Sequence, residues 1–223
     1  GQGAQNVFEG AVVPVSLIGA VLANGLEIKP TKLRGVESNG MLCSEAELGV
    51  ADQASGIWIL PEETPLGVDF VQHAFLKETI LEISILANRG DCQSMIGLAR
   101  EIAAVLDKPI KLPSSPIKRI KGKSPVYLRH HAHEESPYYV AQVIQGLQNK
   151  KTPIWMQRRL QLCGIRSVNA IVDITNYVML EFGQPLHAFD AKKLQGHQIG
   201  VRFAKQGETI QTLDNEVREL TDT

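Results

Sequence analysis

Three features that often reveal the class of a protein are scarce in this sequence: cysteine, net charge and long apolar runs. The three cysteines, Cys43, Cys92 and Cys163, are odd in number and widely spaced, so they predict neither a disulfide framework nor a zinc site. The 23 basic and 24 acidic residues give a net charge of −1, which argues against a strongly basic nucleic-acid binder. No apolar run reaches the roughly 18 residues of a membrane span, and residues 1–10 lack the order of a signal peptide. We therefore expect a reducing, cytoplasmic setting and no membrane partner.

The N-terminal third of the chain predicts short β-strands separated by turn residues. Residues 12–18 are rich in β-formers, and Pro14 among them suggests an edge strand or a bulge. Asn24 and Gly25 are typical of a hairpin turn, and residues 29–34 predict a further strand. Short strands at this spacing predict a small barrel.

A candidate RNA-contact segment lies at residues 32–40, where the sequence reads KLRGVESNG. Its glycines let the backbone come close to a ligand, and its polar residues are typical of a turn. Four side chains supply cations and hydrogen-bonding groups suited to RNA: Lys32, Arg34, Ser38 and Asn39. A solvated loop between strands is the alternative interpretation of the same residues.

The next segment predicts one strand and one helix. Apolar and polar residues alternate over residues 81–85, which predicts a half-buried strand. Residues 95–106 carry an apolar stripe at helical spacing, with Asp91 as the expected N-cap. Arg89 is expected to be solvated or paired with an acidic neighbour such as Asp91, and a phosphate contact is the less favoured interpretation.

Residues 108–125 are rich in Pro, Lys and Ser and predict a linker. Basic residues within it indicate a solvated linker, with RNA contact as the alternative: Lys118, Arg119, Lys121 and Lys123. Three histidines follow: His130, His131 and His133. Imidazoles at this density can hold a metal, but no i, i+4 histidine pair exists, so we predict no metal site. Residues 138–144 predict a strand.

The most informative stretch is 163–190, which reads CGIRSVNAIVDITNYVMLEFGQPLHAFD. Apolar residues recur within it at helical spacing, which predicts a helix with one buried face. Ser167 is the expected N-cap. Gly183 and Pro185 are expected to end the helix.

Three polar residues of this stretch are candidates for chemistry: Arg166, Thr175 and His187. Their spacing allows a cation, a hydroxyl and an imidazole to face an ester and a water at one end of the helix. Each has a structural alternative as well. A helix threonine can hydrogen-bond back to the preceding turn, and a histidine between proline and phenylalanine is often structural, so spacing alone leaves both interpretations open.

Two long signatures resemble the beta subunits of bacterial phenylalanine–tRNA ligases. The first is CGIRS, VDITNYVMLE and GQPLHAFD in order within residues 163–190, and the second is LRGVESNGMLCS at residues 33–44. The first is similar to the start of the family's editing domain, which hydrolyses wrongly formed tyrosyl-tRNA. The second is similar to its tRNA-binding oligonucleotide-fold module. By this resemblance the editing-pocket arginine, threonine and histidine fall on Arg166, Thr175 and His187.

The resemblance implies an α+β multidomain fold in three parts. Residues 1–77 would form a partial OB-like, tRNA-binding barrel, and residues 78–116 would form half of a small helical domain with a linker. Residues 117–223 would form the first part of an α+β editing domain. The family's first barrel strands and its downstream editing glutamate have no counterpart in this sequence, so we expect a fragment with little or no catalysis of its own.

The resemblance also implies partners and cofactors for an assembled enzyme. The partners would be the alpha subunit, tRNA specific for phenylalanine, and a second alpha–beta pair in a heterotetramer. That assembly would use ATP and Mg²⁺ to attach phenylalanine to tRNA, whereas this segment, which has no Gly-rich phosphate loop, is expected to hold no cofactor. Two alternatives remain, namely a tRNA-binding module without chemistry and a scaffold for subunit association.

Overall fold

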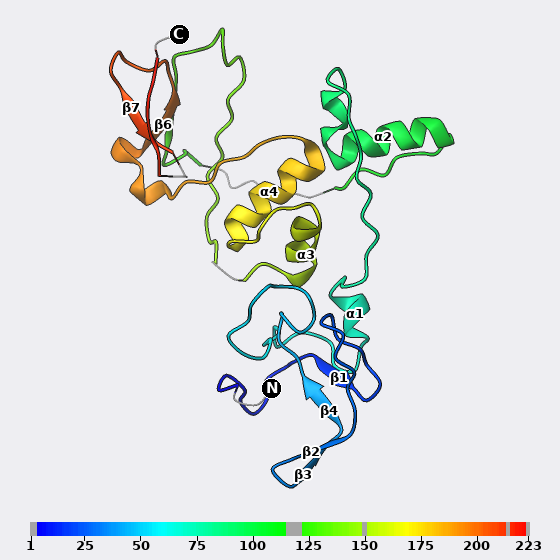
Figure 1. Ribbon diagram of the computed structural model, residues 1–223. Coiled ribbons are helices and arrows are strands. Elements are labelled where there is room, and N and C mark those ends of the chain that lie inside the picture. The colour runs from blue at the N-terminus through cyan, green and yellow to red at the C-terminus, as the bar shows by residue number, and fades with distance from the viewer. Residues whose placement is uncertain (1–3, 115–121, 149–150, 213–214, 222–223) are drawn as a thin grey trace. The chain divides into compact units, whose positions relative to one another are not determined.

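The computed structural model describes residues 4–114, 122–148, 151–212 and 215–221 (Figure 1). Contacts within the chain divide it into two units, and each unit combines two separate stretches of sequence. The first unit comprises residues 1–84 and 152–167, and the second comprises residues 85–151 and 168–223. Both units contain helices and strands, so the predicted α+β content is confirmed.

The first unit contains four short strands: β1 (Val15–Leu17), β2 (Thr31–Leu33), β3 (Val36–Ser38) and β4 (Gly40–Leu42). β1 pairs with β4 and β2 pairs with β3, both antiparallel. Among the residues that the structure describes, these pairs are two separate two-stranded sheets. The closed arrangement of an OB-like barrel therefore stays a prediction.

The buried core of the first unit is small and lies beside the β1–β4 pair. It consists of Leu22, Ile28 and Cys43, and the sulfur of Cys43 lies 3.0 Å from the Ser16 hydroxyl. Two helices complete this unit: α1 (Phe70–His73) and α3 (Ile154–Leu162). The Arg159 guanidinium lies 5.9 Å from the centroid of the Phe75 ring, a cation–π contact between the α3 segment and the residues that follow α1.

The second unit is built from a helix pair and two strand pairs. Its elements are η1 (Gly90–Gln93), α2 (Met95–Leu106), β5 (Tyr127–His130), α4 (Ala170–Phe182), η2 (Ala191–Lys193), η3 (Gln195–His197), β6 (Gln198–Val201), β7 (Thr209–Gln211) and β8 (Val217–Glu219), where η denotes a 3₁₀ helix. α2 packs against α4, β5 pairs with β6 in parallel, and β7 pairs with β8 antiparallel. None of the helices seen in the described ranges is long and apolar enough to cross a membrane.

Two predicted strands are wrong. Residues 81–85 form no strand, and Leu81 is 76% exposed. Residues 138–144 form no strand either, and Tyr138 is 90% exposed. Alternating apolar residues identify a segment that suits one face of a sheet. A strand also needs backbone hydrogen bonds to a neighbouring strand, and neither segment is paired in this way among the described residues.

Two predicted helix caps are also wrong, each by two or three positions. The hydroxyl of Ser94, rather than the carboxylate of Asp91, accepts a backbone N–H at the start of α2. The carboxamide of Asn169, rather than the hydroxyl of Ser167, accepts two backbone N–H groups at the start of α4. The predicted end of α4 at Gly183 is confirmed, because this residue has the left-handed φ of 78° that glycine tolerates.

Candidate functional site

The three predicted editing residues belong to two different units. Arg166 lies in the first unit, in the exposed segment after α3, whereas Thr175 and His187 belong to the second unit. Because the three residues are divided between the two units, a common pocket for their side chains stays a prediction.

Thr175 lies in the middle of α4 and is half-buried. Its hydroxyl donates a hydrogen bond to the carbonyl of Val172 at 2.7 Å. Threonines inside helices often make this hydrogen bond to the preceding turn, so the structural alternative predicted for Thr175 is confirmed. The hydroxyl oxygen retains acceptor capacity, because a hydroxyl has two lone pairs beside its one hydrogen.

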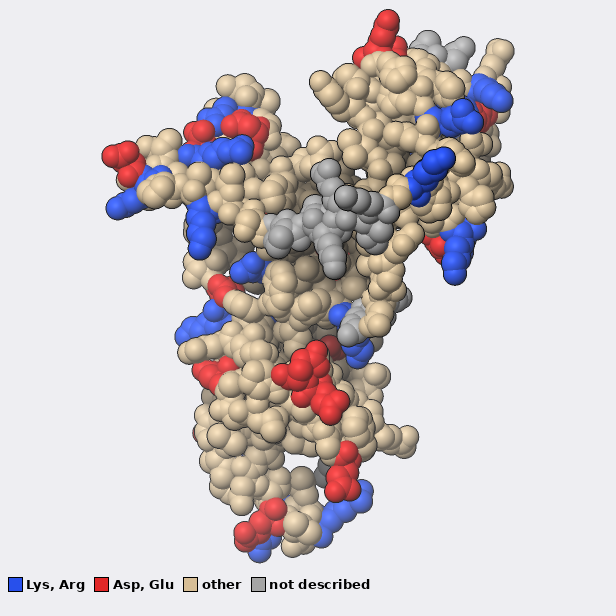
Figure 2. All heavy atoms as spheres, turned by 180° about the vertical axis from the view of Figure 1, so that it is seen from behind, with Lys and Arg blue, Asp and Glu red and all other residues tan. Residues whose placement is uncertain are grey.

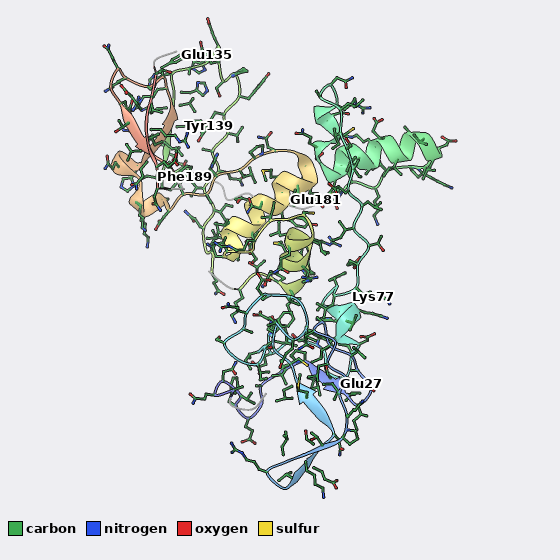
Figure 3. The ribbon with its side chains drawn as sticks, in the orientation of Figure 1. Glu27, Lys77, Glu135, Tyr139, Glu181 and Phe189 are labelled. Carbon is green, nitrogen blue, oxygen red and sulfur yellow. The ribbon has the colours of Figure 1, made fainter. Side chains whose placement is uncertain are left out.

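His187 lies on the loop that joins α4 to η2, which we call the return loop and define as residues 184–189. Its side chain is exposed, and its ring centroid lies 6.3 Å from that of Phe189. Asp190 closes the loop by accepting the backbone N–H of Lys192 at 3.0 Å, as the N-cap of η2. Figure 3 labels Phe189 on this loop and Glu181 near the end of α4. The imidazole is therefore accessible to water and to a ligand, as a general base must be.

Asp173, in the first turn of α4, has a buried structural role that the sequence analysis did not predict. It is 0% exposed, and its carboxylate accepts the backbone N–H of Val168 at 2.9 Å. A negative charge near a helix N-terminus is favoured by the helix dipole. The signal that identifies it is an acidic residue in the first turn of a predicted helix.

A charged cluster lies at η1 and α2 in the second unit. The Arg89 guanidinium donates to the Asp91 carboxylate at 3.0 and 2.8 Å and lies 2.7 Å from Glu101, so the predicted pairing of Arg89 is confirmed. Hydrogen bonds from Arg89 lower the pKa of Asp91 to about 2 and also lower the pKa of Glu101. With Cys92 these carboxylates form a group of metal-type ligands within 4.8 Å. Arg89 pairs with both carboxylates, so the cluster is an ion-pair network.

The histidine-rich segment forms a ring stack. The ring centroids of His130 and His133 lie 4.1 Å apart, and the Tyr139 ring lies 6.4 Å from His130. Both ring nitrogens of His130 are buried without a hydrogen-bond partner among the described residues. Beside this segment, a hollow of about 420 Å³ is lined by Arg129, His131 and residues 198–202.

Two of the predicted RNA-contact residues, Lys32 and Arg34, lie on β2 and the turn of the β2–β3 hairpin. Arg34 and Gly35 form its turn, with φ angles of 50° and 83°, and Lys32 faces Glu37 across the strands. Lys32, Arg34, Gly35 and Glu37 are all exposed. Figure 2 shows acidic and basic side chains next to each other at this end of the first unit. The hairpin is therefore accessible to RNA, although it is of mixed charge.

The other two predicted RNA-contact residues lie at the end of the hairpin, where Ser38 is the last residue of β3 and Asn39 follows it. The Ser38 hydroxyl donates to the carbonyl of Gly40 at 3.1 Å, which fixes the local turn, and Asn39 is exposed. In the predicted basic linker, Lys123 is exposed, and the other three cations lie outside the described residues: Lys118, Arg119 and Lys121.

Comparison with protein families identifies two domains in this chain. A tRNA-binding domain matches residues 2–69, which contain the β2–β3 hairpin, and a B3/4 domain matches residues 135–223, which contain α4 and the return loop. The class of protein is thus one that combines a tRNA-binding domain with a B3/4 domain.

The curated relatives of this chain include beta subunits of phenylalanine–tRNA ligases. The phenylalanine–tRNA ligase beta subunit of Geobacillus kaustophilus is 46% identical over 228 residues, which cover 99% of this chain and 28% of that protein. The beta subunit of Geobacter sulfurreducens is 47% identical over 223 residues, which cover 98% of this chain and again 28% of the relative. By sequence the chain is similar to phenylalanine–tRNA ligase beta subunits over nearly its whole length, and it spans little more than a quarter of the length of these relatives.

Proposed function

We propose that this chain supplies tRNA binding and part of an editing pocket to a phenylalanine–tRNA ligase, an enzyme that attaches phenylalanine to its tRNA at the expense of ATP. One observation carries the proposal: both domains occur in one chain that is 46–47% identical to beta subunits over 98–99% of its length. The proposed partners are the alpha subunit, tRNA specific for phenylalanine and a second alpha–beta pair. Three free cysteines support the proposed cytoplasmic setting.

The proposed domain assignment follows the resemblance. Residues 1–77 act as the OB-like tRNA-binding part, residues 78–116 as part of a small helical domain with a linker, and residues 117–223 as the first part of the editing domain. The two family matches, at residues 2–69 and 135–223, support the outer two assignments.

The proposed editing reaction is hydrolysis of the ester that joins a wrong amino acid to tRNA. The oxygen of a water molecule bonds to the ester carbonyl carbon, the bond from this carbon to the ribose oxygen breaks, and a proton reaches the ribose oxygen. His187 orients the water and accepts its proton, the Thr175 oxygen accepts a hydrogen bond from the substrate, and Arg166 supports the terminal adenosine. The exposed imidazole on the return loop and the free acceptor capacity of Thr175 support these roles.

ATP and Mg²⁺ belong to the proposed assembly rather than to this segment. Among the described residues, Asp91, Cys92 and Glu101 form a group of metal-type ligands, but both carboxylates are paired with Arg89. A thiol and two paired carboxylates do not fit Mg²⁺, which prefers several oxygen ligands and water. No step of the editing reaction is derived through a metal or nucleotide.

A scaffold role is the second candidate, and exposed apolar residues favour it. Leu17 is 68% exposed, Val36 70% and Val105 82%. Exposed apolar side chains mark a contact surface where they gather into a contiguous patch, so the scaffold role requires such a patch within one unit. Under this proposal the same chain holds the subunits together and presents tRNA to the pocket.

The tRNA-binding part is tested by the salt dependence of binding. Lys32→Ala and Arg34→Asn are compared with the parent chain by fluorescence anisotropy on tRNA specific for phenylalanine, and asparagine is chosen because it tolerates a positive φ. Each lost phosphate contact lowers the slope of log affinity against log salt by about one. Lys77→Ala, an exposed lysine outside residues 2–69, is the matched control (Figure 3). Unchanged slopes in both variants contradict a binding role for the hairpin.

A further inference from the structure

The C-terminal end of α4 lies against Ser94, the N-cap residue of α2. A β-carbon built on Gly183 would lie 3.3 Å from the Cβ of Ser94 and 3.5 Å from its hydroxyl oxygen. Figure 1 shows this end of α4 beside η1 and the start of α2. Gly183 therefore meets two requirements at once, a left-handed backbone and a close approach that leaves little room for a side chain.

Ser94 is held firmly in place on its own side of this contact. It is 7% exposed, and its hydroxyl accepts the backbone N–H of Gly97 at 3.1 Å as the N-cap of α2. Gly97 lets η1 pack closely, because a β-carbon there would overlap the carbonyl of Asp91. The position of Ser94 is thus fixed by both the helix that follows it and the turn that precedes it.

The Arg89 ion pairs tie η1 to the middle of α2. One guanidinium bonds Asp91, inside η1, and Glu101, two helical turns into α2. Ser94 lies between these two acidic residues in the sequence. The network therefore braces the segment that Gly183 contacts.

Gly183 is also the residue from which the return loop departs. The left-handed φ of Gly183 sets the direction of residues 184–189, and the Asp190 cap fixes their other end. His187 lies between these two fixed points. The direction in which the imidazole is presented therefore depends on how α4 ends.

We propose that Ser94 is a positioning residue for the return loop: its contact with Gly183 fixes the direction in which His187 is presented. The catalytic part of this statement rests on the proposed editing role of His187. Ser94 lies outside residues 135–223, so part of the machinery that orients the editing loop lies outside the matched B3/4 domain.

Two substitutions test the contact. Gly183→Ala places a methyl group against Ser94, and the double variant Gly183→Ala with Ser94→Gly removes the obstructing side chain while the φ strain remains. Gly207→Ala is the matched control, because Gly207 has a φ of 75° and no atom within 4 Å of the added carbon. Ser94→Thr is a milder probe that keeps the capping hydroxyl and adds one methyl group.

The first readout is the NMR signal of the His187 ring in the 223-residue chain, assigned by its loss in His187→Ala. The proposal expects this signal to shift in Gly183→Ala and Ser94→Thr, to return toward its parent position in the double variant, and to stay in place in Gly207→Ala. A His187 signal that is the same in all of the folded variants overturns the proposal, and so does a Gly183→Ala shift that the double variant leaves unchanged.

The second readout separates this proposal from the proposed function. Hydrolysis of tyrosyl-tRNA is measured in an assembled ligase whose beta subunit carries the same substitutions. A displacement of about 1 Å can cost roughly a hundredfold in rate, so we expect Gly183→Ala to lose about 10- to 100-fold and the double variant to recover part of that loss. A shifted His187 signal with unchanged hydrolysis upholds Ser94 as a positioning residue and contradicts the editing role of His187.

Discussion

The carboxylate of Asp173 accepts the backbone N–H of Val168 at 2.9 Å while Asp173 itself is 0% exposed. A buried carboxylate is costly unless it is hydrogen-bonded, so this residue stabilises the fold only through its partners. Asp173→Ala leaves the Val168 N–H without this acceptor. We expect the free energy of unfolding to fall by about 1–3 kcal/mol, measured by urea denaturation of the 223-residue chain.

Asp69→Ala is the control for this prediction. Asp69 is an exposed N-cap of α1 that accepts the Val71 N–H at 3.0 Å, so its loss should cost about 1 kcal/mol or less. Equal losses in the two variants would show that burial of Asp173 adds nothing to its contribution.

The Arg89 network makes stability depend on pH in the acidic range. The pKa of Asp91 is lowered to about 2 in the folded chain by hydrogen bonds from Arg89, against about 3.9 when unfolded. A lowered carboxylate pKa gives stability that is present above the unfolded value and is lost as pH falls toward the folded value. Arg89→Ala should therefore flatten the dependence of the melting temperature on pH between about 4 and 2.

Arg100→Ala is the matched control on the same helix. Arg100 is exposed, and no ion pair of this network involves it, so its removal should leave the acidic slope unchanged. If Arg89→Ala keeps the parent slope, the ion pairs seen in the structure do not persist in solution.

Substitutions of Thr175 distinguish a structural role of its hydroxyl from a catalytic role. Its hydroxyl donates a hydrogen bond to the carbonyl of Val172. Because this bond replaces one to water, it contributes about 1 kcal/mol or less to the free energy of unfolding at a half-buried site. Thr175→Val should therefore leave the urea midpoint close to that of the parent while tyrosyl-tRNA hydrolysis by an assembled ligase falls about tenfold or more. Thr175→Ser restores the hydroxyl and should restore the rate. A valine variant as active as the parent would leave Thr175 with its structural role alone.

Local signals in the sequence predicted α4 well. Its apolar spacing located the helix. Gly183 marked its end because a left-handed backbone is required there and glycine adopts it readily. The cap at Asn169 was missed because Ser167 and Asn169 both suit the role, and the choice between them depends on where the backbone turns. Residues 81–85 failed for a different reason, since alternation describes one segment and a strand requires two.

The contact between Ser94 and Gly183 could not be predicted from local pattern. The two residues are far apart in the sequence, and neither belongs to an apolar stripe. The signatures around Arg166, Thr175 and His187 were sufficient to reveal the similarity to phenylalanine–tRNA ligase beta subunits. They did not indicate that a capping serine of another segment lies against the end of the helix.

The most direct test of the account is tyrosyl-tRNA hydrolysis by the assembled ligase and by the 223-residue chain, each with and without His187→Ala. His131→Ala serves as the control, because His131 is an exposed histidine of the same unit whose backbone, rather than its ring, pairs with Val201. The account predicts that the assembled enzyme hydrolyses tyrosyl-tRNA, that His187→Ala alone abolishes this activity, and that the folded chain by itself shows little or none. Hydrolysis by the assembled enzyme that survives His187→Ala would contradict the assignment of this segment to the editing pocket.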